Sequence, residues 1–173
     1  NKGALLTSYI SLPGRYLVLL PNKLCGGISR KIDSEEDRQK IKGLMEQIKV
    51  PEDMGFIVRT AGINRTKSEI QRDYQFLMRL WKDIKKKADS VAAPYFLYQE
   101  TDFGVRTLRD YLTLDVDQIL VDDLETFRKM RAYLRAVAPR NLKILKQYKE
   151  KGPIFGCYDL EDQIRVIYQE RVE

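Results

Sequence analysis

A chain of 173 residues with 43% hydrophobic and 32% charged residues has the composition of a globular protein with one domain or two small ones, which excludes a disordered chain. No apolar run approaches the roughly 20 residues needed to cross a bilayer, so we expect no membrane span. The net charge of +6 favours a polyanionic partner. The basic surplus is concentrated early, because residues 1–104 hold 18 Lys and Arg against 13 Asp and Glu, whereas residues 105–173 hold 13 against 12.

The first part of the chain is predicted to contain short strands and two helices. Ser34 is placed to cap a helix that continues to about Ile48, and Thr66 with Glu69 forms a capping box for the longest helix. Trp81 lies on the apolar stripe of that second helix, so we interpret it as core, with a base-stacking platform as the alternative. Short apolar runs bounded by turn residues predict strands at residues 15–20 and 54–58, and residues 26–31 are expected to form a turn that enters another short strand.

After Pro94 the pattern alternates between strand and helix, which is typical of an α/β layer. Asp122 or Asp123 is placed to cap a helix through about Val137. We therefore expect an α+β or α/β fold in which small mixed sheets pack with helices, divided near residue 104 into subdomains 1–104 and 105–173. The expected strands of the second part are residues 95–98, 118–121 and 142–148, and the expected helices are 105–112, 122–137 and one from about residue 159.

Histidine is absent, which excludes imidazole ligation of a metal and any Ser–His or Cys–His nucleophile pair. Two cysteines, Cys25 and Cys157, are too few for a disulfide framework or a four-ligand zinc site, so we expect reduced thiols in a cytoplasmic protein. Chemistry in this chain would need carboxylates with a metal ion. Asp122 and Asp123 suggest such a site, but a helix cap explains them better because a helix pattern follows directly.

One segment supplies the donors that a terminal phosphate needs, at the end of a predicted strand. Arg59 offers a planar fork of N–H groups and Thr60 offers a hydroxyl, and Gly62 allows a close approach to the backbone. Taken alone, an Arg-Thr pair is more often a structural salt bridge. Gly14, in a second tight turn, either makes the turn or exposes its backbone to a ligand.

The combination of these segments resembles the ribonuclease E/G family. Three blocks, in this order and at this spacing, match the 5′-sensor region of that family, and further blocks extend the resemblance over essentially the whole chain. The three blocks are Ile10-Ser11-Leu12-Pro13-Gly14-Arg15-Tyr16-Leu17-Val18-Leu19-Leu20-Pro21-Asn22, Gly26-Gly27-Ile28-Ser29-Arg30 and Gly55-Phe56-Ile57-Val58-Arg59-Thr60-Ala61-Gly62. The further blocks are residues 94–100, 105–106, 109–112, 119–122 and 153–155.

The resemblance implies that Gly14, Val18, Arg59 and Thr60 hold the 5′-monophosphate end of single-stranded RNA. We expect backbone donors near Gly14 to bind the remaining phosphate oxygens, and the resemblance makes Arg30 a weaker RNA contact. The chain would then be the RNA-binding part of a single-strand-specific endoribonuclease of RNA processing and decay.

The resemblance also implies that residues 105–173 form a ribonuclease H-like scaffold without ribonuclease H catalysis. In the family a His-Tyr-Gln-like stretch of that scaffold touches structured RNA, and here only Tyr158 matches it. Cys157 and Asp159 depart from the pattern, and the carboxylate of Asp159 would repel phosphate.

The family's catalytic machinery is not expected in this sequence. Hydrolysis in the family uses two aspartates and a magnesium ion in a DNase I-like domain, with a zinc-binding Cys motif beyond it and an S1 barrel before the sensor. We therefore expect a fragment with no catalytic residue, metal site or cofactor of its own, taken from a Mg-dependent and homo-oligomeric parent enzyme. The alternatives are a stand-alone nucleic-acid-binding module without nuclease activity and a carboxylate-metal enzyme that uses Asp122 and Asp123.

Overall fold

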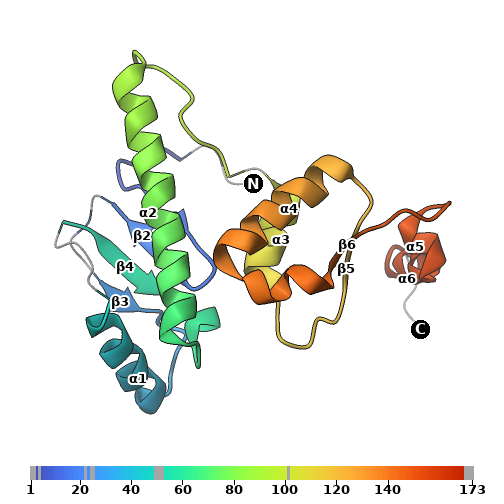
Figure 1. Ribbon diagram of the computed structural model, residues 1–173, viewed down its shortest axis with the longest axis horizontal. Coiled ribbons are helices and arrows are strands. Elements are labelled where there is room, and N and C mark those ends of the chain that lie inside the picture. The colour runs from blue at the N-terminus through green and yellow to red at the C-terminus, as the bar shows by residue number, and fades with distance from the viewer. Residues whose placement is uncertain are drawn as a thin grey trace.

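Four short apolar strands form one mixed sheet in the first part of the chain (Figure 1). They are β1 (Leu12–Pro13), β2 (Leu17–Leu20), β3 (Gly27–Ile28) and β4 (Gly55–Val58), in the spatial order β1-β2-β4-β3. Strand β2 runs antiparallel to β1 and β4, whereas β3 runs parallel to β4. The computed structural model describes residues 3, 5–21, 23, 26–48, 53–100 and 102–169, so that Cys25 lies outside the described residues.

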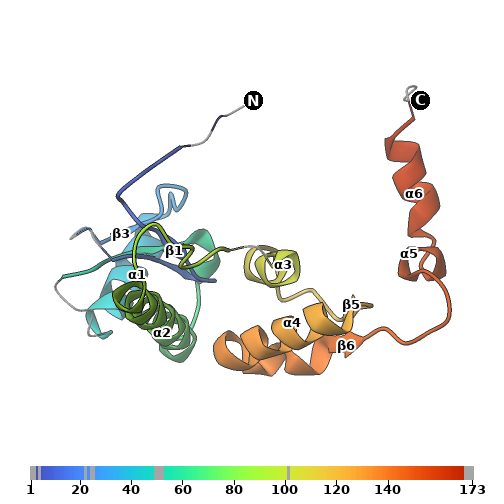
Figure 2. The ribbon, with the colours of Figure 1, turned by 90° about the horizontal axis from the view of Figure 1, so that it is seen from above.

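Helix α2 (Lys67–Ser90) crosses one face of this sheet (Figures 1 and 2). Because side chains alternate along a strand, Leu17 and Leu19 of β2 point to the buried face and Val18 to the other. Ile70 and Leu77 of α2 complete the cluster, and Leu77 is fully buried. Trp81 is half-buried against the same cluster, which agrees with its interpretation as core.

The first two helices begin where their cap signals predict. The Ser34 hydroxyl accepts a hydrogen bond from the N–H of Asp37 and starts helix α1 (Glu35–Glu46). Thr66 and Glu69 form the reciprocal capping box that starts α2. These side chains satisfy N–H groups that a helix end would otherwise leave without an acceptor.

The second part of the chain is built on a parallel β-α-β unit. Strands β5 (Ile119–Val121) and β6 (Leu145–Gln147) pair in parallel, and α4 (Leu124–Val137) with the 3-10 helix η2 (Pro139–Ile144) connects them. A connection through a helix is what a parallel pair requires. Helix α3 (Phe103–Tyr111) packs beside α4 around a second hydrophobic cluster.

Two short helices end the described chain, far from the four-stranded sheet (Figures 1 and 2). They are α5 (Ile154–Cys157) and α6 (Leu160–Ile167), and they pack mainly on each other. None of the described helices of the molecule is long and apolar enough to cross a membrane.

Two predicted strands are wrong in whole or in part. Residues 95–98 form no strand, and the Lys87 ammonium at the end of α2 donates to the carbonyls of Phe96 and Leu97. The segment 142–148 is a strand only over β6, because η2 occupies its first residues. The mixed α+β fold is confirmed. The division near residue 104 stays a prediction, since Phe76 of α2 packs against both hydrophobic clusters.

Candidate functional site

The sheet topology brings most of the candidate residues to one end of the sheet. The turn between β1 and β2 lies at this end, because Leu17 at the start of β2 pairs with Val58 at the end of β4. Strand β3 ends there too, since Ile28 also pairs with Val58. Residues that follow β3 and β4, and those that precede β2, are therefore neighbours although they come from three separate segments of the chain.

The β1–β2 turn is held from inside by Asp73 of α2. Its carboxylate is fully buried and accepts hydrogen bonds from the backbone N–H groups of Arg15, Tyr16 and Leu17, at 3.0, 2.8 and 2.9 Å. Burial raises the pKa of Asp73 above its ordinary value, and the three N–H donors act in the opposite direction. This carboxylate fixes the shape of the turn.

The absence of a side chain at Gly14 leaves room for the Asp73 carboxylate. A Cβ built on Gly14 would lie 2.6 Å from Oδ2 and 2.8 Å from Oδ1 of Asp73, which is closer than real Cβ atoms come. The bare Cα of Gly14 therefore faces the interior of the protein, while its carbonyl faces Arg59. Of the two roles considered for this glycine, the structure supports the one in the turn.

The donors expected from the backbone near Gly14 are already in use. The Gly14 N–H donates to the carbonyl of Leu17 at 2.7 Å, and the next three N–H groups bind Asp73. That expectation is wrong in the structure described here. A phosphate at this end of the sheet would be met by side chains and by the backbone that follows β4.

Arg59 follows β4 directly and is fixed at two of its N–H groups. Nη1 donates to the Gly14 carbonyl at 2.6 Å, and Nη2 donates to Oδ1 of Asp110 in α3 at 2.7 Å. The backbone N–H of Arg59 continues the ladder by donating to the Tyr16 carbonyl. With a side-chain exposure of 29%, the guanidinium is held in one place and remains open to solvent.

Asp110 belongs to a chain of alternating charges. Arg109 binds it with two hydrogen bonds, from Nε to Oδ1 at 3.0 Å and from Nη2 to Oδ2 at 2.8 Å, and Arg109 also pairs with Glu100. The hydrogen bonds from Arg109, followed by those from Arg59, lower the pKa of Asp110 to about 2. The carboxylate facing Arg59 is therefore charged at any physiological pH.

Thr60 and Val18 complete the group at this end of the sheet. Thr60 starts the 3-10 helix η1 (Thr60–Gly62) and is exposed. Its hydroxyl has no hydrogen-bond partner among the residues that the structure describes. Val18 is half-buried and pairs with Ile57, so by alternation both lie on the sheet face away from α2, the face on which Arg59 follows Ile57.

The two weaker RNA-contact predictions fall in different places. Arg30 is exposed in the turn after β3, at the same end of the sheet as Arg59. Tyr158 is half-exposed at the end of α5, in the part of the molecule most distant from the sheet (Figure 2). Beside it, the Cys157 thiol is exposed and accepts a hydrogen bond from the Tyr148 hydroxyl. The structure does not bring Tyr158 together with the other candidates.

Three supporting residues were missed at the level of sequence. Asp73 interrupts the apolar stripe of α2 between Ile70 and Leu77, and a charge on a buried face is a signal of a specific internal partner. Asp110 stands inside a block that carried the family resemblance, but its partner Arg59 lies 51 residues earlier. Arg65 donates from Nε to the Ala61 carbonyl of η1 and lies over the Tyr16 ring.

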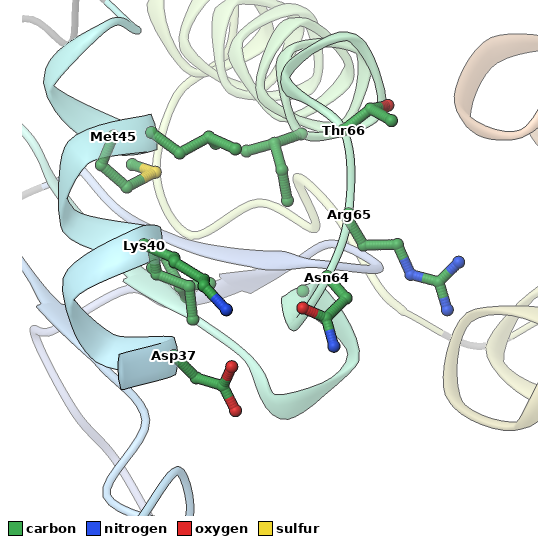
Figure 3. Close-up of a pocket in the computed structure, with 11 residues that line it drawn as sticks. Asp37, Lys40, Met45, Asn64, Arg65 and Thr66 are labelled. Atoms are coloured by element: carbon green, nitrogen blue, oxygen red, sulfur yellow. The ribbon is translucent and has the colours of Figure 1, made fainter. Parts of the chain in front are cut away.

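A separate cavity of about 290 Å³ lies beside η1, between α1 and the loop that leads into α2 (Figure 3). Figure 3 shows Lys40 and Met45 of α1 on one side and Asn64 on the other, with the Arg65 side chain pointing away. Val58 lines this cavity from the buried face of β4. The cavity is therefore on the other side of the strand from Ile57 and Arg59, and none of the candidate phosphate-binding side chains enters it.

The paired aspartates at the start of α4 act as a helix cap. The Asp123 carboxylate accepts from the N–H of Thr126 at 2.6 Å, and Asp122 accepts from the N–H of Asp123. Within the described part of the chain, no three Cys, Asp or Glu side chains gather as they would around a metal ion.

Comparison with known proteins gives one consistent result. The profile of the Ribonuclease E/G family matches residues 11–173. The chain is 40% identical over 173 residues to Ribonuclease E of Haemophilus influenzae and 41% identical over 174 residues to Ribonuclease E of Escherichia coli. It is 33% identical over 173 residues to Ribonuclease G of E. coli.

The matches cover nearly all of this chain and a minor share of each relative. They include 99% of the chain for both ribonucleases E and 100% for ribonuclease G. They span 18%, 16% and 35% of the three relatives in the same order. The blocks that carried the resemblance, including those that hold Gly14, Arg59 and Asp110, all lie within or overlap the matched residues. The chain belongs to the ribonuclease E/G family.

Proposed function

We propose that this chain is the RNA-binding region of a single-strand-specific endoribonuclease and that it recognises the 5′-monophosphate end of RNA. The observation that carries the proposal is the guanidinium of Arg59, held open to solvent at the end of β4 beside the free hydroxyl of Thr60. Gly14 supports it through its carbonyl, and Val18 contributes an apolar surface on the same face of the sheet.

The chemistry of the two side chains suits a terminal phosphate. A guanidinium has five N–H groups, and Arg59 uses two of them within the protein. The others can bind phosphate oxygens, while the Thr60 hydroxyl supplies a neutral donor beside them. RNA with a 5′-hydroxyl end would leave these donors without an acceptor. A 5′-triphosphate would bring two further charged groups towards Asp110 and the strand that carries Val18.

The activity of the whole enzyme is part of the same proposal. The relatives are named as ribonucleases E and G, and we propose that this chain serves RNA processing and mRNA decay in the cytoplasm within a homo-oligomeric enzyme. Hydrolysis there would use magnesium, with zinc as a structural ion, at residues outside those described here. We propose residues 1–104 as the sensor subdomain and residues 105–173 as its ribonuclease H-like scaffold.

The test is a binding titration with short single-stranded RNAs that differ only at the 5′ end. The wild-type chain should bind the 5′-monophosphate form more tightly than the 5′-hydroxyl and 5′-triphosphate forms. Arg59→Gln keeps some hydrogen bonding and removes the charge, so it should cost on the order of 1.5–3 kcal/mol of that preference, as for a charged hydrogen bond. Thr60→Val removes only the hydroxyl, so its cost should be smaller.

Arg135→Gln is the matched control, because Arg135 is an exposed arginine of α4 in the second part of the chain. It should change the affinity for all three RNAs equally and weakly. Equal affinity of the wild-type chain for the three RNA ends would refute the sensor assignment.

A further inference from the structure

We propose that a basic groove on one flank of α2 is a second RNA-binding surface, which holds internal segments of single-stranded RNA through phosphate contacts and through base contact with Trp81. The groove is separate from the Arg59 site, and it would take RNA of any sequence. The inference rests on the proposed function in one respect, namely that the ligand of this chain is RNA.

Four cations of the C-terminal half of α2 line this groove, which has a volume of about 570 Å³. They are Arg79, Lys82, Lys85 and Lys86, and all four are exposed. None of them forms an ion pair or a hydrogen bond with a residue that the structure describes. Among the described lining residues the only acid is Asp89, so the groove has an excess of positive charge that is available to phosphates.

The helix end alone does not explain where these cations lie. The dipole of a helix favours cations in its last turn, and Lys87 fits that role because its ammonium binds the carbonyls of Phe96 and Leu97. Arg79 and Lys82 lie about two to three turns before the end of α2. That is beyond the reach of the dipole effect, so their gathering in one groove indicates a separate anionic partner.

The floor of the groove is apolar and contains an aromatic ring. Met54, Met78 and Trp81 line it, and each of them is half-buried. Trp81 therefore contacts the first hydrophobic cluster and the groove at the same time. Proteins that hold single strands without sequence preference combine cations with aromatic side chains, because every base has a flat face that can lie against a ring.

The groove and the Arg59 site lie at opposite ends of β4. Met54 precedes this strand and Arg59 follows it, a separation of roughly 17 Å along an extended chain. The groove is also on a different flank of α2 from Phe76, which packs against Tyr133 of α4. Figure 1 shows the C-terminal half of α2 extending past the sheet. A dinucleotide bound at Arg59 would therefore not reach the groove, whereas a longer RNA can occupy it.

An anionic membrane surface is the other polyanion that such a row of cations could attract. A helix that lies in a lipid interface inserts exposed, bulky apolar side chains between the lipids. The three apolar side chains of this groove are half-buried instead, so they offer a floor for a flat base and little to insert. The shape of the groove therefore favours RNA.

The first experiment uses the double variant Lys82→Gln/Lys86→Gln and a single-stranded RNA with a 5′-hydroxyl end, to which Arg59 contributes little. Removing two exposed phosphate contacts should lower the affinity by roughly threefold to tenfold. The slope of log affinity against log salt should fall by about 0.7 for each contact, hence by about 1.4. The relative preference for a 5′-monophosphate end should stay as in the wild-type chain, because Arg59 is untouched.

The matched control is Lys143→Gln/Lys146→Gln, which removes two exposed lysines from the second part of the chain and should leave affinity and slope nearly unchanged. Wild-type affinity and slope in Lys82→Gln/Lys86→Gln would overturn the groove while leaving end recognition standing. Equal binding of all RNA ends by the wild-type chain, with weaker binding by this variant, would refute the proposed function and support the groove. If the variant loses binding to phosphatidylglycerol vesicles and keeps its RNA affinity, the groove belongs to a membrane and the proposal fails.

A second experiment needs no variant, because Trp81 is the single tryptophan of the chain. The 5′-hydroxyl RNA should quench its fluorescence as bases contact the indole. Inorganic polyphosphate carries the charge without bases, so it should compete with the RNA and leave the emission nearly unchanged. A dinucleotide with a 5′-monophosphate should also leave the emission unchanged, since it stays at Arg59. Unchanged emission at saturating RNA, or equal quenching by polyphosphate, would contradict the proposal.

Discussion

At the scale of single residues, the fold itself requires a glycine at position 14, which the family resemblance assigns to phosphate binding. Gly14→Ala would place a methyl group 2.6 Å from the Asp73 carboxylate, which must then move and weaken its three N–H bonds to the turn. Overpacking together with loosened buried hydrogen bonds should lower the free energy of unfolding by about 2–4 kcal/mol. Urea denaturation of both proteins measures this difference.

The matched control for that variant is Gly43→Ala. Gly43 is exposed inside α1, and nothing lies within 4 Å of the position its Cβ would take. Alanine there should increase stability by about 0.5–1 kcal/mol, because it reduces the entropy of the unfolded chain and favours helix. Equal effects of the two substitutions would contradict the role given to Asp73.

The pKa of Asp110 gives a pH dependence whose sign is fixed. Its pKa is lowered from the ordinary value to about 2 in the folded chain, so its charged form stabilises the fold above about pH 4. This contribution is lost as the pH falls towards 2. Because Asp110 is partly exposed, we expect it to be on the order of 1–2 kcal/mol.

Asp110→Asn should therefore be less stable than the wild-type chain near neutral pH, and the difference should narrow between about pH 4 and pH 2. Guanidinium denaturation at several pH values measures the difference, with Asp117→Asn expected to stay within about 0.5 kcal/mol of wild type. A difference that is constant over this range would mean that Asp110 does not act through its charge.

The sequence marked Arg59 and Thr60 as candidates for binding a phosphate, but it did not reveal the residues that hold them. The two candidates follow an apolar run, and the family resemblance singled them out. Asp73 lies 56 to 58 residues from the β1–β2 turn residues that it binds. Asp110 lies 51 residues from Arg59. No local pattern contains such a pair, because the sheet and α2 must first bring the segments together. For the same reason the sequence could not show that the N–H groups near Gly14 are already bound.

At the scale of secondary structure elements, helix starts were predictable, whereas two of the predicted strands were wrong in whole or in part. Ser34, Thr66 and Asp123 cap their helices through side-chain bonds only three residues long, which the sequence displays directly. A strand depends on a partner that is remote in the sequence. Residues 95–98 have the aromatic composition of a strand, but the Lys87 ammonium binds two of their carbonyls, and three of the four side chains stay exposed.

The start of α4 offers a test between a cap and a metal site. Asp123→Ala removes the bond to the Thr126 N–H and should lower the melting temperature and the helix content of the chain. It should not change RNA affinity or create or abolish any response to magnesium. We expect the wild-type chain itself not to cleave RNA. Magnesium-dependent cleavage of single-stranded RNA that is lost in Asp122→Ala or Asp123→Ala would establish the carboxylate-metal alternative.

At the scale of the whole molecule, charge is organised differently in the two parts. The first part carries most of the basic surplus, yet Arg59 at the candidate site is paired with Asp110 of α3. The guanidinium of Arg15 donates to the Leu112 carbonyl, and the backbone N–H of Arg15 binds Asp73. The site therefore presents a fixed and partly neutralised guanidinium instead of a strongly positive patch. Such a site should contribute selectivity, while other Lys and Arg side chains contribute general attraction to RNA.

This separation leads to a prediction about salt. Each cation that neutralises an RNA phosphate releases condensed counterions, so the logarithm of the affinity falls with the logarithm of the salt concentration by about 0.7 per contact for single strands. The wild-type chain should show a steep, linear dependence for 5′-monophosphate RNA. Arg59→Gln removes one contact and should reduce the slope by about 0.7, whereas with 5′-hydroxyl RNA the two proteins should give nearly the same slope. Fluorescence anisotropy titrations from low to physiological salt measure all four slopes.

Arg135→Gln should follow the wild-type chain with both RNAs, since Arg135 is exposed on α4 in the second part of the chain. A flat dependence for the wild-type chain would argue against RNA binding altogether. An equal loss of slope with both RNAs would show that Arg59 binds phosphates along the strand instead of the phosphate at its end.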